Sequence, residues 1–317
     1  MNIDKQISIK LNDVLLNSML DLEMRKLIIS CWEESLKTAD PYKWAKLTFF
    51  SSELFTGDEE KVLPGALAME LFALAADIFD DIQDQDNHQM PWRKIPFAQA
   101  ISLANCLLFL SYQALLTIEN TYKLSKIVQI FNETGLKASQ GQYKEFEEQT
   151  RYSFSIDEYI DILAKKSGSF AECACKIGGI LAEAPQEAIN DMGEIGTNIG
   201  IIAQISNDLR DITDFENKSD FVYKKKTLPF LYLINVLEKE RAEEFANLIR
   251  VARINQTNLS QKEQESLLAI IKEEGAIHFC LIFQDMFRQK ALKLLEQIQV
   301  KEEKRSKLEQ LINVISQ

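Results

Sequence analysis

Two clusters of oxygen-bearing side chains are the residues of this chain whose types and spacing could do chemistry. The first has aspartates at positions 77, 80, 81 and 84, and on a helix these spacings place all four on one face. Four like charges on one face repel one another unless a cation is bound. Carboxylates without neighbouring His or Cys suit Mg²⁺ or Mn²⁺. A solvated acidic helix end would show the same pattern, so this cluster alone leaves both interpretations open.

The second cluster, Asn207, Asp208 and Asp211, also forms one oxygen-rich stripe if its segment is helical. Such spacing is common on helix surfaces, but both clusters emerge from apolar runs, and two such stripes are harder to explain by chance. If the two helices face each other, they could hold two or three Mg²⁺ ions around a diphosphate. The predicted metal ligands are Asp80, Asp81, Asp84, Asn207, Asp208 and Asp211.

Lysines stand at two places where they could neutralise phosphate oxygens. Lys166 follows Tyr159 on a predicted helix, and Lys225 lies one loop length after the second cluster. A lysine ammonium is a suitable point charge for phosphate. Either lysine taken alone is more simply interpreted as a solvated surface residue.

The elements that must position these side chains are long helices. Gly (11) and Pro (6) are scarce in the 317 residues, so the chain has too few of these turn-forming residues for a many-stranded sheet. Apolar residues recur at helical spacing from Leu67 to Ile82 and from Ile195 to Ile212, and the prolines stand between such runs. No Ser/Gly/Pro-rich linker divides the chain. The sequence therefore predicts one all-α domain over residues 1–317.

The net charge of −12 repels phosphate backbones, so we expect no nucleic-acid partner. Only His88 and His278 are present, and any metal must therefore rest on carboxylates. The five cysteines show no disulfide spacing, which fits a reducing compartment. We expect a cytoplasmic protein, with at most a loose association with membranes.

The stretch from Ile95 to Ile118 carries no formal charge and is long enough to cross a bilayer. Polar side chains recur through it, however, and no basic flank would orient it. We expect a helix buried on all sides in the middle of a bundle, and no transmembrane segment. The first twenty residues have the pattern of an amphipathic helix and not of a signal peptide.

The motifs and their order resemble those of the trans-isoprenyl diphosphate synthases, from about Pro41 to the C-terminus. The two clusters resemble the first and second aspartate-rich motifs of that family. The other matching segments are Gly141-Gln142-x-x-Glu145, Tyr159 with Lys166-Ser167, Ala174–Ala184, and Asp220 followed by Lys225, Thr227, Leu228 and Pro229. The resemblance implies a helical bundle of the isoprenoid-synthase fold around a deep central cavity, with Mg²⁺ as cofactor.

Within the family, the first cluster and the overall acidity are most similar to the tryptophan isoprenyltransferases of Gram-positive quorum sensing. This resemblance implies geranyl or farnesyl diphosphate as the donor and a pheromone precursor peptide as the acceptor; whether the enzyme is a homodimer stays open. The expected catalytic residues are Asp80, Asp84, Asp208, Lys166 and Lys225, and the expected diphosphate contacts are Gln142, Lys166, Gln204 and Lys225.

The sequence departs from the family pattern at three places. Asn207 stands where the second motif normally begins with Asp, so one metal would lose a charged ligand but keep an amide oxygen. Gln89-Met90-Pro91 stands where the family has Arg-Arg-Gly, with Arg93 and Lys94 displaced, and this bears on the acceptor. The N-terminal Gly-Lys-Arg-x-Arg-Pro is also missing, and no arginine occurs between Arg25 and Arg93. The alternatives left open are a chain-elongating synthase that uses isopentenyl diphosphate, a terpene cyclase, and an inactive partner subunit.

Overall fold

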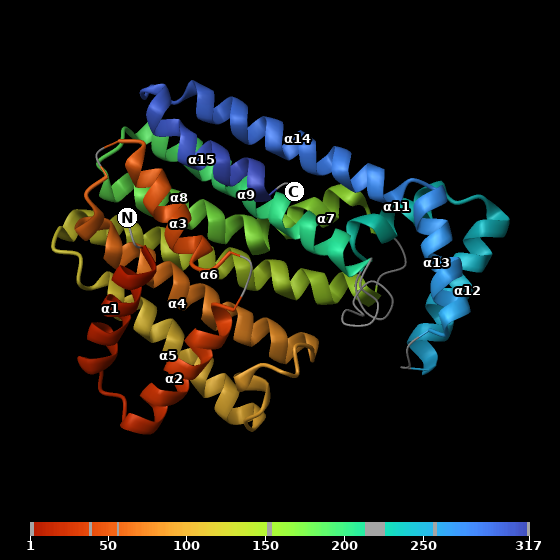
Figure 1. The fold of residues 1–317 in the computed structure, drawn as a ribbon, viewed down its shortest axis with the longest axis horizontal. Helices are drawn as coiled ribbons and strands as arrows, with labels where there is room; N and C mark the ends of the chain where they lie inside the picture. The colour runs from red at the N-terminus through yellow and green to blue at the C-terminus, as the bar shows by residue number, and fades with distance from the viewer. Residues whose placement is uncertain are drawn as a thin grey trace. The chain divides into compact units, whose positions relative to one another are not determined.

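All regular structure in the part of the chain that this computed structural model describes is helical, which confirms the predicted all-α class (Figure 1). The structure describes residues 3–37, 40–55, 57–150, 154–212, 226–255 and 259–315. The helices of the first half are α1 (Ile3–Leu16), α2 (Leu22–Ser35), α3 (Lys43–Glu53), α4 (Glu59–Asp84), the short 3₁₀ turn η1 (Pro91–Arg93), α5 (Phe97–Leu115) and α6 (Thr121–Thr150). The second half has α7 (Ile156–Leu163), the π-helical turn η2 (Ala164–Gly168), α8 (Ser169–Leu181), α9 (Gln186–Asp211), α11 (Leu228–Val236), α12 (Lys239–Asn255), α13 (Gln261–Glu273), α14 (Ala276–Gln297) and α15 (Glu302–Ile315).

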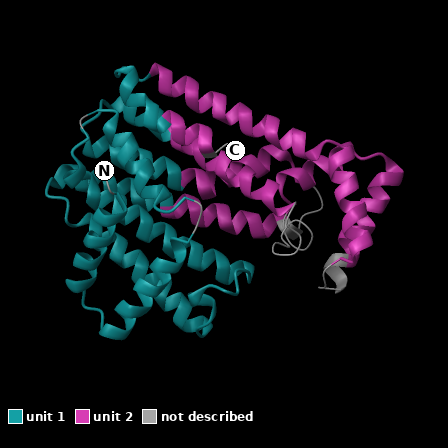
Figure 2. Ribbon diagram, viewed as in Figure 1, with its two compact units in different colours: residues 1–134, 170–193, 298–308 teal, residues 135–169, 194–297, 309–317 magenta. Residues whose placement is uncertain are grey.

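The helices form two compact units, each assembled from separate stretches of chain (Figure 2). Unit 1 consists of residues 1–134, 170–193 and 298–308, and unit 2 of residues 135–169, 194–297 and 309–317. Helices α6, α9 and α15 each contribute residues to both units. No single cut in the sequence therefore separates the units, and the interpretation of residues 1–317 as one domain stays a prediction.

Helix α4 is the core helix of unit 1 and carries the first acidic cluster at its C-terminal end. Every residue from Pro64 to Ala75 is buried, and α1, α3 and α5 pack against this stretch. A helix that is apolar on all faces is stable only when neighbours cover it on every side. The single acidic residue within the stretch, Glu70, is buried as well. The same helix that is most deeply buried thus delivers Asp80 and Asp84 at its end.

Helix α5 is buried on one face only. By length and composition α4 and α5 are both apolar enough to cross a membrane, but 72% of the apolar window of α4 is buried within the protein, against 44% of that of α5. Leu103 and Leu107 are fully buried, whereas Phe109 and Leu116 are 70% and 68% exposed. The prediction of a helix buried on all sides was therefore wrong, because only residues three and four apart share the face that packs on α4.

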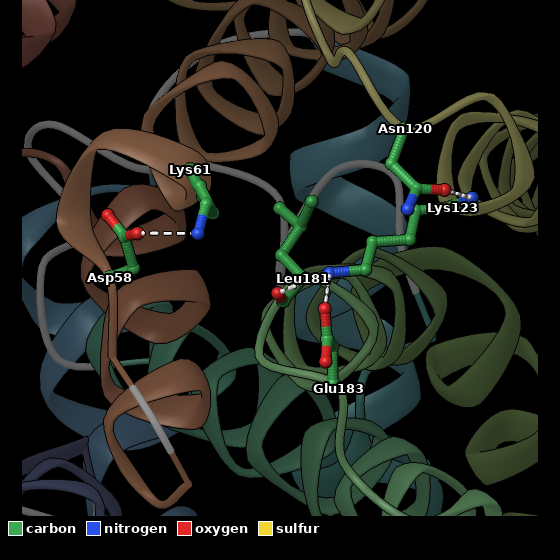
Figure 3. Close-up of polar contacts among 6 residues, drawn as sticks. All are labelled: Asp58, Lys61, Asn120, Lys123, Leu181 and Glu183. Atoms are coloured by element: carbon green, nitrogen blue, oxygen red, sulfur yellow. Dashed lines mark hydrogen bonds and ion pairs between the residues drawn. The ribbon is translucent and has the colours of Figure 1, made fainter.

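Salt bridges and caps hold several helix ends of unit 1 in place (Figure 3). The ammonium of Lys123, in the first turn of α6, donates to the carbonyl oxygen of Leu181 at 3.1 Å and to Oε1 of Glu183 at 2.8 Å. The side chain of Asn120 accepts the backbone N–H of Lys123 at 3.0 Å. A lysine at the C-terminal end of α8 satisfies a carbonyl that the helix itself leaves unbonded. The end of α8 is therefore fixed to the start of α6.

Helix α8 also approaches α3 closely, and Gly178 makes that approach possible. A Cβ atom at residue 178 would lie 2.3 Å from the carbonyl oxygen of Thr48 and 2.9 Å from Cβ of Ser51. Backbone atoms cannot move aside as the end of a flexible side chain can. Gly178 thus sets the distance between the two helices.

In unit 2, α7, α9, α11 and α14 enclose one apolar cluster. Ile202, Ile205, Leu231 and Cys280 at its centre are fully buried. Tyr232 of α11 stacks on Phe279 of α14, with ring centroids 4.3 Å apart. A second cluster joins α11 to the α12 and α13 helices. The packing of α9 against α7 and α11 is what brings the second acidic cluster next to its partners.

We expect Gly178→Ala to lower the free energy of unfolding by about 1–3 kcal/mol, because overpacking against the backbone of α3 outweighs the better helix propensity of Ala. Gly193→Ala is the matched control, since its new Cβ would meet only the flexible end of Lys176. The control should leave stability unchanged or raise it by up to about 1 kcal/mol. Chemical denaturation measures both. Equal effects of the two substitutions would contradict the close-approach argument.

Candidate active-site residues

The first acidic stripe lies along the last two turns of α4 in unit 1 and consists of the aspartates of the first acidic cluster, Asp77, Asp80, Asp81 and Asp84. Asp77 is exposed, Asp80 is half-buried and Asp84 is only 4% exposed. The helix ends at Asp84, and its C-cap residue Gln85 has a left-handed φ of 58°. Asp80 and Asp84 are one turn apart on the same face, as the sequence spacing predicted.

Asp81, on the same stripe, holds the loop that follows α4. Its Oδ2 accepts the indole N–H of Trp92 at 2.7 Å, and its Oδ1 accepts from the side-chain amide of Asn87 at 2.7 Å. Burial raises the pKa of Asp81 to about 6; the two hydrogen bonds lower it, and the nearby Asp77 and Asp80 raise it. Both oxygens of Asp81 are thus engaged within the protein, and its predicted role as a metal ligand stays a prediction.

Lys43, in the first turn of α3, is a described cation whose charge acts on Asp77 of this stripe. The surrounding protein raises the pKa of Asp77, although the residue is exposed, and Lys43 opposes that shift while Asp80 adds to it. The ammonium of Lys43 also lies 4.9 Å from the ring centroid of Trp44. The other lysine of this turn, Lys46, forms an ion pair with Asp40 at 2.5 Å.

The second stripe lies at the end of α9 in unit 2, and Asp208 is its most buried member at 1% exposure. Its Oδ2 accepts the phenol O–H of Tyr159 at 2.6 Å and the backbone N–H of Leu228 at 3.2 Å. Burial raises the pKa of Asp208 to about 7, and the bonds from Tyr159, Leu228 and Gln204 hold it below the value that burial alone would give. One carboxylate therefore joins α7, α9 and the start of α11.

The π-helical turn η2 presents Lys166 and Ser167 between α6 and α9. Lys166 forms an ion pair with Glu145 of α6 at 2.5 Å, and Ser167 donates to Oε1 of Gln204 at 3.1 Å. Two glycines permit these approaches: a Cβ at Gly141 would lie 2.9 Å from Cγ of Lys166, and one at Gly200 would lie 2.4 Å from the carbonyl oxygen of Ser167. π-Helical turns are frequent at functional sites.

The structure thus brings together Ser167, Gln204, Asp208 and Tyr159 as one polar chain within unit 2. Gln142 lies half-buried on α6, next to Gly141. Asp211 is buried, and the side-chain oxygen of Asn207 accepts from Arg210. The predicted phosphate ligand Lys225 lies outside the described residues.

The donor chemistry of both stripes suits Mg²⁺, because it consists of carboxylate and amide oxygens. Burial raises the pKa values of Asp81 and Asp208, which means that their ionised forms are destabilised unless positive charge is near. A bound divalent cation would supply that charge. Within each unit, the described residues include no group of three or more His, Cys, Asp or Glu arranged to hold a metal ion.

Two residues with a clear structural role were not found from the sequence. Glu70 accepts the backbone N–H of Ala45 at 2.7 Å, and Trp92 donates to Asp81. The signal for Glu70 was present, because one carboxylate inside a long apolar run must have buried hydrogen-bond partners. No sequence signal indicated Trp92, since its partner depends on how the loop after α4 folds back.

Comparison with known proteins identifies the family. A sequence model of the polyprenyl synthetases matches residues 25–267. This chain belongs to that family. Tryptophan prenyltransferase ComQ of Bacillus subtilis subsp. natto is 26% identical over 304 residues, covering 96% of this chain and 90% of that protein. The short chain isoprenyl diphosphate synthase of Methanocaldococcus jannaschii is 25% identical over 236 residues, covering 71% and 70%.

Solved structures show the same fold for this polyprenyl synthetase family member. A geranylgeranyl pyrophosphate synthase superposes with a TM-score of 0.87 at 19% identity, covering 99% of this chain and 97% of the other. The geranylgeranyl pyrophosphate synthetase of Pyrococcus horikoshii gives 0.83 at 21% identity, covering 99% and 95%. The predicted isoprenoid-synthase fold is thereby confirmed.

We expect Tyr159→Phe to lower the free energy of unfolding by about 1–3 kcal/mol at pH 8, and by less at pH 5. The phenol hydrogen bond lowers the pKa of Asp208, so it favours the ionised carboxylate, which the native state holds only above about pH 7. The stability that the bond contributes is therefore greatest above that pH. Denaturation at the two pH values measures the difference.

Tyr232→Phe is the matched control, because its hydroxyl donates to a backbone carbonyl, that of Glu274, at 2.9 Å. A carbonyl does not titrate, and the loss in this variant should be the same at both pH values. If Tyr159→Phe were equally insensitive to pH, the Asp208 argument would be wrong.

Proposed function

We propose that this polyprenyl synthetase family member is a Mg²⁺-dependent prenyltransferase that moves a geranyl or farnesyl group from its diphosphate to a tryptophan of a pheromone precursor peptide in the cytoplasm. The observation that carries the choice of acceptor is in the sequence: the arginines that the family pattern places before and after the first acidic stripe are missing, and Gln89 and Met90 stand in place of the second pair. An elongating enzyme must hold a second diphosphate within bond-forming distance of the first, and arginine forks are the usual means of doing so.

The residues of unit 1 support an uncharged acceptor. No arginine occurs between Arg25 and Arg93. Lys46 is already paired with Asp40, and the loop after α4 places Trp92 rather than a cation against Asp81. Among the described residues, Lys43 is a lysine whose charge acts on Asp77 of the stripe. A single ammonium binds a diphosphate less well than an arginine fork does, whereas an indole needs no cationic pocket.

The similarity to ComQ along 96% of the chain supports the same choice. The similarity to short chain and geranylgeranyl diphosphate synthases supports the second candidate, a chain-elongating synthase that uses isopentenyl diphosphate. The two candidates share the donor and differ only in the nucleophile. The acceptor is therefore what an experiment must decide.

In the proposed mechanism Asp80 and Asp84 of α4, with Asn207, Asp208 and Asp211 of α9, would hold Mg²⁺. Bound Mg²⁺ would act as a Lewis acid that stabilises the charge on the leaving diphosphate. Asp81 keeps the loop after α4 in place through Trp92 and Asn87. Lys166 and Lys225 would neutralise further diphosphate oxygens, and Gln142 and Gln204 would orient the diphosphate.

The reaction breaks the bond between C1 of the prenyl chain and the diphosphate oxygen, and the leaving oxygen keeps the electron pair. A carbon of the indole ring donates the pair for the new C–C bond, and the acceptor releases one proton. An allylic cation reacts readily with water, so apolar side chains must exclude water from it. Phe72 and Phe170, which are buried with ring centroids 4.7 Å apart, are suitable for this role.

We expect Asp80→Ala and Asp84→Ala to lower kcat by at least about 100-fold, since several kcal/mol of leaving-group stabilisation would be lost. Helicity by circular dichroism should not change. Glu60→Ala is the control, because it removes an exposed carboxylate from the opposite end of α4. Chelation should abolish activity and Mg²⁺ should restore it; restoration by Zn²⁺ alone, or near-normal rates in either variant, would count against the mechanism.

We expect isopentenyl diphosphate to be neither consumed nor inhibitory at concentrations at which a Trp-containing peptide is prenylated. The measurement uses purified protein, Mg²⁺, labelled geranyl or farnesyl diphosphate, and a panel of synthetic peptides with one Trp each. A matched panel with Phe in place of Trp is the control and should remain unmodified. Efficient formation of a longer diphosphate would overturn the peptide assignment and favour the elongating synthase.

A further inference from the structure

Glu70 is a buried carboxylate that the proposed mechanism does not use. It lies in the middle of α4 with 9% exposure, within the fully buried stretch from Pro64 to Ala75. Its Oε1 accepts the backbone N–H of Ala45, in the first turn of α3, at 2.7 Å. The backbone N–H groups of Ala45 and Trp44 and the charge of Lys43 all favour its ionised form, against the burial that disfavours it. Glu70 therefore accepts a hydrogen bond from a first-turn backbone amide of α3, which is the role that an N-cap side chain normally has.

The N-cap residue of α3 does not do this itself. Tyr42 occupies the N-cap position with φ of 58°, and its side chain makes no capping hydrogen bond. It is buried instead: its ring meets that of Trp32 edge-on, with centroids 6.1 Å apart, and its hydroxyl lies 3.2 Å from that of Ser8. A left-handed conformation at a bulky residue persists only where surrounding contacts hold it. The start of α3 is thus held by α1 and α2 on one side and by Glu70 of α4 on the other.

The turn that is held in this way presents an ammonium and an indole. Lys43 is exposed, and its charge acts on Asp77, one turn before Asp80. Trp44 is half-buried, and its ring lies 5.7 Å from that of Phe170, which in turn packs on Phe72. The same short turn thus connects the acidic stripe with the buried aromatic residues of unit 1.

A local cap would satisfy the same amides at lower cost, because a Ser or Asp at the N-cap remains close to water. A carboxylate on α4 does something that a local cap cannot do. It ties the first turn of α3 to the helix that carries the first acidic stripe, ten residues before Asp80. The buried carboxylate of Glu70 therefore helps to set the position of Lys43 and Trp44 relative to that stripe.

We propose that Glu70 is a positioning residue for the acceptor side of the reaction: its carboxylate fixes the first turn of α3, and this turn contacts the acceptor through Lys43 and Trp44. The assignment of an acceptor role rests on the proposed prenyl transfer. The placement of the turn by Glu70 does not depend on the proposed prenyl transfer. It can be tested without any substrate.

The first test is amide hydrogen exchange of the full-length protein, measured by mass spectrometry on the segment 42–48. In Glu70→Ala, the first-turn amides of α3 should exchange at least tenfold faster than in the parent. Glu70→Gln keeps an oxygen that accepts from Ala45, so exchange in that variant should stay within about threefold of the parent. Leu67→Ala is the control for general destabilisation, since it removes a fully buried side chain one turn earlier on α4. It should not selectively expose this turn.

The second test separates positioning from loss of fold by kinetics. Glu70→Ala should raise KM for the acceptor at least tenfold and change KM for the allylic donor less than twofold, with rescue by Glu70→Gln. Trp44→Leu leaves Glu70 in place and should show the same split, which keeps the proposal testable if Glu70→Ala does not fold. An unchanged acceptor KM in Trp44→Leu, or equal losses for donor and acceptor, would overturn the acceptor role.

The two results also distinguish the proposals from each other. Unchanged exchange in Glu70→Ala would overturn the positioning role whatever the acceptor is. If the parent elongates isopentenyl diphosphate and ignores peptides, the proposed function fails, and the exchange result still decides whether Glu70 positions α3.

Discussion

A carboxylate that is buried among helices cannot take hydrogen bonds from the backbone in the interior of its own helix, and much of this structure depends on that constraint. The backbone N–H groups in the interior of a helix already bond to carbonyl oxygens within it. Asp208 therefore takes donors from Tyr159 of α7 and from the free amide at the start of α11, and Asp81 takes them from Trp92 and Asn87 of the following loop. Asp208 in this way joins segments that are distant in sequence, and Asp81 holds the loop that follows its own helix.

The same burial gives the two acidic stripes their chemical character. In water these aspartates would be ionised at low pH, but within the protein the pKa of Asp208 rises to about 7 and that of Asp81 to about 6. Carboxylates that are costly to ionise, together with amide oxygens, suit hard divalent cations such as Mg²⁺, the cofactor that the proposed function requires. The hydrogen bonds from Tyr159 to Asp208 and from Trp92 to Asp81 stabilise the ionised carboxylates without supplying charge. The hydrogen bonds from neutral partners and the proposed binding of a cation would both offset the same desolvation of the carboxylates.

Under the proposed function, the departures of this chain from the family pattern concern the nucleophile more than the leaving group. Both acidic stripes and the turn bearing Lys166 are retained, whereas the first turn of α3 has Trp44 and an already paired Lys46 in a region where the family has arginines. A diphosphate acceptor requires several fixed cations, and an aromatic acceptor requires a flat apolar surface with water excluded. The aromatic contacts from Trp44 through Phe170 to Phe72 satisfy the second requirement better than the first.

The sequence by itself determined the all-α class, the helical faces on which the aspartates lie and the family, because each of these depends on local spacing and motif order. Helical periodicity places Asp80 next to Asp84, whatever packs around them. Which partners each carboxylate has was decided only by the tertiary structure: nothing in the spacing indicates that Asp81 accepts from Trp92 and Asn87. The half-exposed face of α5 and the role of Glu70 in holding α3 were likewise settled by packing, since the partners of a buried group come from other segments of the chain.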